Sequence, residues 1–153
     1  MHRESLFTMS TTTAISRDRR LVWANVALLL AVLVHDVDHA RQMAVQCFTL
    51  SNLLITITLL GFVPGLVALT LAWRGHRWAA RLTLGFGLLI TAIAVGVHML
   101  GGGPFFEYYA VSYFQLPVDG WSWAALWLVA AVAVATAGVA MRSMQHQRPG
   151  AQR

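Results

Sequence analysis

Two histidines and two aspartates stand together at the end of an apolar run, in the stretch LVHDVDHARQ over residues 33–42. On a helix, His35 and His39 present their rings on one face at a spacing of four residues, which lets both bind one metal ion. A third histidine, His98, is the only ionisable residue that follows Arg81 in its own apolar segment. Imidazole nitrogens suit zinc, copper and non-haem iron. We therefore take His35, His39 and His98 as the candidate ligands of a transition metal ion.

Several polar residues near these histidines are candidates for the same site. Asp38 shares the helix face of His35 and His39, so its carboxylate could act as a fourth ligand or accept a hydrogen bond that fixes an imidazole tautomer. Asp36 points about 100° away from that face. The candidates that would surround the site or cover it are Asp36, Arg41, Gln42, Asn52 and Glu107.

The composition indicates which elements position these residues. The chain has 153 residues, of which 58% are hydrophobic and only 11% are charged, whereas about a quarter of the residues in a soluble domain are charged. Four apolar segments are long enough to cross a hydrocarbon core of roughly 30 Å, and they cover about residues 21–48, 51–73, 78–100 and 118–141. The sequence thus predicts an all-α, four-helix transmembrane bundle in the cell membrane, between a disordered tail over 1–20 and a second tail over 142–153.

The candidate site lies at the membrane edge because the first apolar run is short. This run, Leu21–Val34, has fourteen residues, which as a helix extend about 21 Å and do not cross the hydrocarbon core. The helix must therefore continue through HDVDHARQ. A polar stripe on such a helix is expected to face protein or water, because an unpaired charge in hydrocarbon is costly.

The placement of the arginines predicts the orientation of the bundle. All eleven basic residues are arginines, and Arg41 is the only one on its side of the predicted spans. The other ten flank the opposite ends, which predicts that both termini and the second connection are cytoplasmic. In the resulting up-down-up-down order, His98 reaches the same outer level as HDVDHARQ. The third connection, GGGPFFEYYAVSYFQLPVDG, is a long aromatic outer loop that carries Glu107 and Asp119.

The working hypothesis is a metal site that serves redox chemistry, metal handling or metal-assisted hydrolysis, and the sequence leaves open whether the protein is an enzyme. The metal would be copper, zinc or iron. A haem held by His98 and by His39 or His35 is the weaker metal hypothesis, because Asp36 and Asp38 would be unfavourable in an apolar haem pocket.

Two further functions need no metal. A non-enzymatic membrane subunit would use the outer polar cluster as a hydrogen-bonded network that docks a partner or lipid. A small proton-coupled carrier would relay protons through the histidines and carboxylates. The expected partners are the lipid bilayer and either further copies of the chain or a larger membrane complex; the arginines are assigned to anionic headgroups and not to nucleic acid. Cys47 is the single cysteine, which excludes an intramolecular disulfide.

Overall fold

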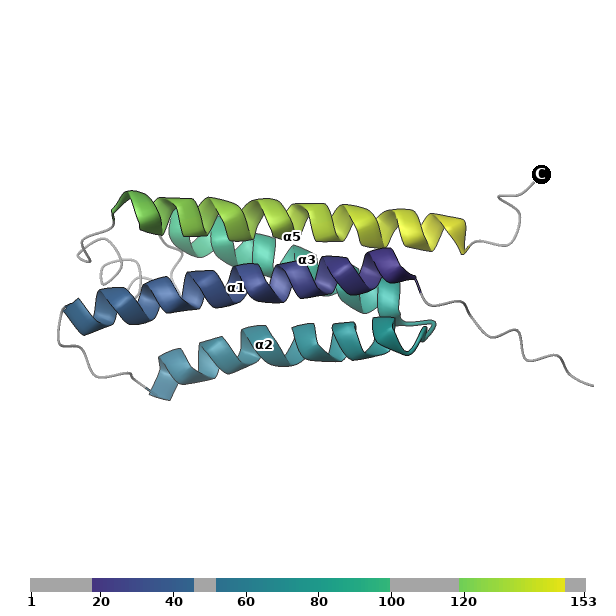
Figure 1. The fold of residues 1–153 in the computed structure, drawn as a ribbon, viewed down its shortest axis with the longest axis horizontal. Helices are drawn as coiled ribbons and strands as arrows, with labels where there is room; N and C mark the ends of the chain where they lie inside the picture. Colours follow the sequence, from purple (N-terminus) through teal and green to yellow (C-terminus); the bar gives the residue numbers. More distant parts are fainter. Residues whose placement is uncertain (1–17, 46–51, 100–118, 148–153) are drawn as a thin grey trace, which may run out of the picture.

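The computed structural model of the chain is all-helical and describes residues 18–45, 52–99 and 119–147 (Figure 1). Its helices are α1 (Arg19–Val45), α2 (Asn52–Trp73), α3 (Ala79–Ile93), a π-helical turn η1 (Ala94–Met99) that continues α3, and α5 (Gly120–His146). Three stretches of these helices are long and apolar enough to cross a membrane, namely Arg19–Arg41, Ala79–Gly96 and Gly120–His146. The all-helical fold and the membrane-like character of the chain are thus confirmed.

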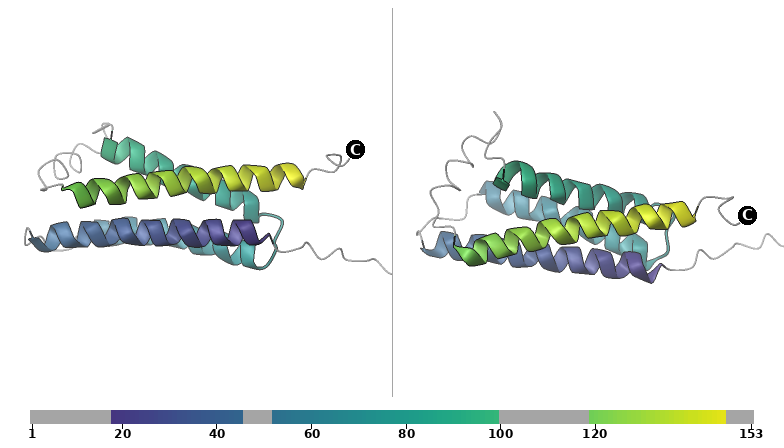
Figure 2. Two further views of the ribbon diagram at one scale, coloured as in Figure 1. Left: turned by 45° about the horizontal axis from the view of Figure 1, so that its top comes forward. Right: turned by 90° about the horizontal axis from the view of Figure 1, so that it is seen from above.

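The four long helices lie along one common axis (Figures 1 and 2). α1 packs between α2 and α5, and α3 packs against the same two helices from the far side, so that α1 and α3 face each other across the interior of the bundle. Side chains that reach from α1 to η1 therefore meet inside the bundle and not on its surface.

Two apolar clusters fill the described interior. One lies in the middle of the bundle and contains Leu28, Leu29, Ala31, Val32, Phe86, Ile90, Ala94, Leu126, Val129, Ala130 and Ala133. The other lies toward the start of α1 and contains Leu21, Val22, Ala72, Ala79, Ala80 and Ala140. Large apolar side chains such as Leu30, Val63 and Val134 point outward and are more than half exposed, as is expected of a surface that contacts lipid.

Two polar contacts join α1 to its neighbours within the apolar interior. The Nδ2 atom of Asn25 donates to Thr83 Oγ1 of α3 at 2.8 Å and to its own helix at Leu21 O, also at 2.8 Å. Thr136 Oγ1 of α5 donates to Ala24 O of α1 at 3.2 Å. These bonds pair the Asn25 Nδ2 and Thr136 Oγ1 groups in an apolar surrounding and join α1 to both α3 and α5.

The end of the third helix differs from the sequence prediction. The pattern over 78–100 predicts one regular α-helix, whereas the structure changes to a π-helical turn at Ala94. A π-turn holds one more residue than an α-turn and so rotates the following side chains by about 100° relative to a continuous α-helix. The direction of His98 is therefore set by η1 and does not follow from the periodicity of α3.

Candidate metal centre

Three histidine side chains converge at one end of the bundle. α1 provides His35 and His39, and η1 provides His98. The Nε2 atom of His35 lies 3.1 Å from Nε2 of His39 and 3.2 Å from Nε2 of His98. Ligand atoms from the three rings all lie within 4.8 Å of one another. His35 is buried, with 9% of its surface exposed, and the other two are half-buried.

Hydrogen bonds between the rings do not account for this arrangement. A ring nitrogen carries either one hydrogen or one in-plane lone pair, so it acts as one donor or one acceptor in a given state. Nε2 of His35 nevertheless faces two other Nε2 atoms at hydrogen-bond distance. In any one tautomeric state, His35 Nε2 can form a well-aligned hydrogen bond with only one of these two nitrogens. The contact with the other nitrogen is then not a good hydrogen bond.

A metal ion would satisfy all three nitrogens at once. Zinc binds imidazole nitrogens at about 2.0–2.1 Å in a tetrahedral arrangement, which places the nitrogens about 3.3 Å apart. The observed separations of 3.1 and 3.2 Å are close to that spacing. The His35 ring meets the rings of His39 and His98 edge-on, at interplanar angles of 71° and 62°, and the rings of His39 and His98 are tilted by 47°. The three histidines could therefore hold a metal ion.

The interior next to this centre is apolar. Val32 lies one turn before His35 on α1, and Ala94 lies one turn before His98; both belong to the middle apolar cluster. Asn25, the nearest buried amide along α1, lies ten residues before His35 and is bonded to Thr83. Within the described residues, apolar side chains of the middle cluster thus lie between the three histidines and the hydrogen-bonded pair of Asn25 and Thr83.

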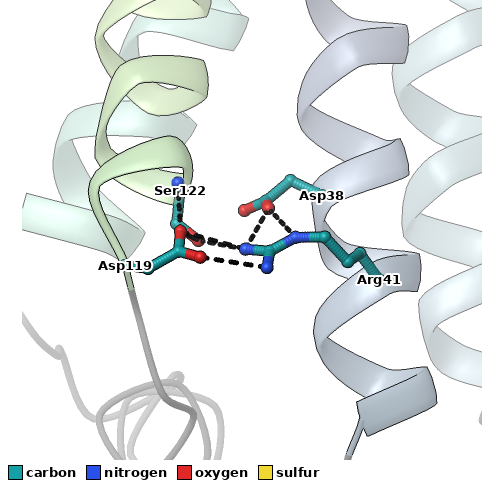
Figure 3. A network of polar contacts seen from close by, with 4 residues as sticks. All are labelled: Asp38, Arg41, Asp119 and Ser122. Carbon is teal, nitrogen blue, oxygen red and sulfur yellow. Dashed lines mark hydrogen bonds and ion pairs between the residues drawn. The ribbon is translucent and has the colours of Figure 1, made fainter.

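A second polar group joins α1 to α5 at the same end (Figure 3). We call it the outer network, and it consists of Asp38, Arg41, Asp119 and Ser122. Nε of Arg41 donates to Asp38 Oδ1 at 2.9 Å, and Nη2 lies 2.8 Å from the same oxygen. Arg41 also contacts both carboxylate oxygens of Asp119 at 3.0 Å and the hydroxyl of Ser122 at 3.2 Å. The network ties the end of α1 to the start of α5.

Asp119 also begins α5. Its side chain accepts a hydrogen bond from the backbone N–H of Ser122 at 3.0 Å, as the N-cap of a helix does. This N–H and then the Arg41 guanidinium lower the pKa of Asp119 below its ordinary value. Because the pKa is lowered on folding, the contribution of this carboxylate to stability is present above its unfolded pKa and is lost as the pH falls.

The predicted site residues fall into four groups. His35, His39 and His98 come together as expected. Asp38 does not join their cluster of ligand atoms but lies in the outer network, with Arg41. Asp36 has one buried carboxylate oxygen for which the described part of the chain provides no hydrogen-bond partner. Three predicted site residues cannot be placed: the side chains of Gln42 and Asn52 and the whole of Glu107 lie outside the described part of the structure.

Ser122 is the network residue that sequence reasoning missed. Its signal was the pattern Asp119-Gly-Trp-Ser122 directly before an apolar run, which is typical of a helix N-terminus with a capping aspartate. The pattern predicts that Ser122 lies in the first turn beside the cap. It does not predict that both side chains contact Arg41, because that contact depends on how α1 and α5 are packed.

Replacing Arg41 with glutamine is expected to destabilise the protein, because the Asp38 side chain is only 2% exposed and would lose the guanidinium beside it. Asp119→Asn is the control, since this carboxylate is half exposed and exposed ion pairs contribute little. Thermal unfolding in detergent should give a clearly lower melting temperature for Arg41→Gln than for Asp119→Asn. Equal melting temperatures would show that Asp38 does not depend on Arg41.

Comparison with known proteins gives no assignment: no protein-family model, curated protein or solved structure matches this chain. The function is therefore inferred from the geometry of the site.

Proposed function

We propose that this protein is a membrane protein that binds one transition metal ion through His35, His39 and His98. The observation that carries the proposal is the convergence of three Nε2 atoms, of which the central one has two close partners and only one hydrogen or lone pair to offer. A bound cation removes this conflict, since all three nitrogens then act as lone-pair donors.

The ligand set favours a metal that accepts neutral nitrogen donors. Three imidazoles are found around catalytic zinc, and they also suit copper and iron(II). A set of three protein ligands leaves a fourth position for water or substrate. The supported chemistries are therefore metal-assisted hydrolysis, redox reactions of copper or iron, and metal handling.

The centre is proposed to lie at the outer face of the cell membrane, with both termini in the cytoplasm. The described arginines at the opposite end of the bundle are all exposed, and they are Arg19, Arg20, Arg74, Arg77, Arg81 and Arg142. Among the described arginines, only Arg41 lies at the end of the bundle that carries the three histidines. This distribution agrees with the positive-inside rule.

A haem and a proton-coupled carrier are supported less well by the same geometry. Axial histidines bind a haem iron from opposite sides of the porphyrin, whereas the nitrogens here converge from three directions with no space for a plane between them at 3.1 and 3.2 Å. A carrier needs a polar path through the bundle, and the described residues beside the centre form an apolar cluster.

The second candidate function is a non-enzymatic membrane subunit that docks a partner or lipid at this end. The outer network supports this function, because the contacts of Arg41 with Asp38, Asp119 and Ser122 form a polar network without a cofactor. It does not explain why three histidine nitrogens are brought together.

The first test is to measure the metal content of the protein after purification in detergent without a polyhistidine tag. The second is to treat the protein with a chelator and then titrate it with zinc and with copper. We expect about one equivalent of one metal per chain, and a rise in melting temperature when the metal is restored. A protein that binds neither ion above background would rule out the proposed function and favour the docking subunit.

A further inference from the structure

The proposed ligands bring no charge to compensate a metal ion. Three neutral imidazoles around a divalent ion leave a net charge of +2 at the edge of the membrane, where burial of charge is costly. A nearby fixed negative charge would lower that cost, and its effect would be larger there than in water because the surroundings are less polar. A buried carboxylate next to the histidines would supply this charge.

Asp38 is such a carboxylate. It directly precedes His39 on α1, it lies three residues after His35, and it is only 1% exposed. Arg41 does not cancel the charge of Asp38 fully, because the Arg41 side chain is 41% exposed and is shared with Asp119 on the far side. A charge in contact with water is screened more strongly than a buried one.

The outer network holds one oxygen of Asp38, and Asp38 is not among the clustered ligand atoms of the three histidines. Both Nε and Nη2 of Arg41 contact the Oδ1 atom of Asp38, and Arg41 is itself held by Asp119 and Ser122 (Figure 3). The carboxylate is thus fixed on the residue that precedes His39, and it is turned toward α5.

We propose that Asp38 is the fixed counter-charge of the metal centre, held by Arg41, and that it makes the centre prefer a divalent ion over a monovalent one. This inference rests on the proposed function. Its physical basis is that the interaction of one negative charge with an ion is proportional to the charge of that ion. Removing the charge should therefore lower the logarithm of the affinity twice as much for a divalent ion as for a monovalent ion in the same place.

Copper serves as the probe because it offers both charges in one element. The affinities of the purified chain for Cu(II), and for Cu(I) under ascorbate and argon, are measured by competition with a chromogenic chelator of each ion. Asp38→Asn is the test variant, since asparagine keeps the oxygen that accepts from Arg41. We expect a loss of about 10–100-fold for Cu(II), the range known for residues that surround metal ligands, and of about 3–10-fold for Cu(I).

Two variants separate charge from structure. Asp38→Glu keeps the charge and should retain the wild-type ratio of the two affinities. Asp18→Asn removes a carboxylate at the opposite end of α1, outside the network, and should change each affinity by no more than about threefold. If Asp38→Asn does not fold, the double variant Asp38→Asn with Arg41→Gln removes both charges of the pair together. It should still lower the affinity for Cu(II) more than the affinity for Cu(I), because the buried charge is screened less than the exposed one.

The outcomes are distinct. Equal losses for Cu(II) and Cu(I) in Asp38→Asn would show a purely structural role and overturn the inference, and so would unchanged affinities. A wild-type chain that binds neither ion would instead overturn the proposed function.

Discussion

Replacing His98 with alanine is expected to lower the affinity for a transition metal ion by about a hundredfold or more, because residues that merely support a ligand already contribute 10–100-fold. His98 is the only one of the three candidate ligands that comes from η1, so its loss reduces the site to the pair His35 and His39. The affinity is measured by titrating the chelator-treated chain with zinc and copper. His35→Ala should have an effect at least as large, because His35 contacts both other rings.

His146→Ala is the matched control for this experiment. His146 is an exposed histidine at the far end of α5, so the same substitution removes an imidazole without touching the site. It should leave both the affinity and the metal-induced rise in melting temperature unchanged. If His98→Ala kept that rise, the three histidines would not form the binding site. If it lowered the stability of the metal-free chain alone, they would be a structural network.

The helices could be predicted because the length of each apolar run is a physical requirement of the membrane. The predicted segments 21–48, 51–73 and 78–100 overlap α1, α2 and α3 with η1, whose described parts are Arg19–Val45, Asn52–Trp73 and Ala79–Met99. The fourth prediction ended at Met141, whereas α5 continues to His146. Hydropathy marks where hydrocarbon ends, but a helix continues beyond that point as long as its backbone hydrogen bonds do.

The meeting of the three histidines could be predicted in outline. A spacing of four places His35 and His39 on one face, and alternating helix directions bring His98 to their level. The structure confirms that these three residues come together; metal binding itself stays a prediction. Periodicity could not supply the final geometry, since the direction of His98 depends on the π-turn η1, for which AVGVHM contains no recognisable signal.

The partner of Asp38 was harder to predict than its position. Sequence spacing shows that Asp38 and Arg41 are neighbours on a helix, and this pair is found. Spacing within α1 does not tell which neighbouring helix the pair faces. The contacts with Asp119 and Ser122 are made across 78 and 81 residues of sequence, so they arise only from the way in which α1 and α5 pack.

Packing of α3 against α5 is also expected to be sensitive to a single methyl group. A Cβ atom at Gly87 would lie 2.9 Å from Ala133 O and 3.1 Å from Ala137 N. Both are backbone atoms of α5, which can retreat only if the two helices separate. Gly87→Ala should therefore lower the free energy of unfolding by about 1–3 kcal/mol, the usual cost of overpacking. The measurement is equilibrium unfolding in detergent in the presence of a chelator, so that metal binding does not contribute to the stability.

Two other glycines provide a graded control. A Cβ at Gly85, on the same helix, meets no atom within 4 Å, so Gly85→Ala should not destabilise the protein. A Cβ at Gly65 meets the ends of the Leu29 and Phe86 side chains, which can rotate where a backbone cannot, so the cost of Gly65→Ala should fall between the other two. If Gly87→Ala were as stable as Gly85→Ala, α3 and α5 would not be in backbone contact. Because α3 leads directly into η1, the position of His98 relative to α1 would then be less firmly fixed.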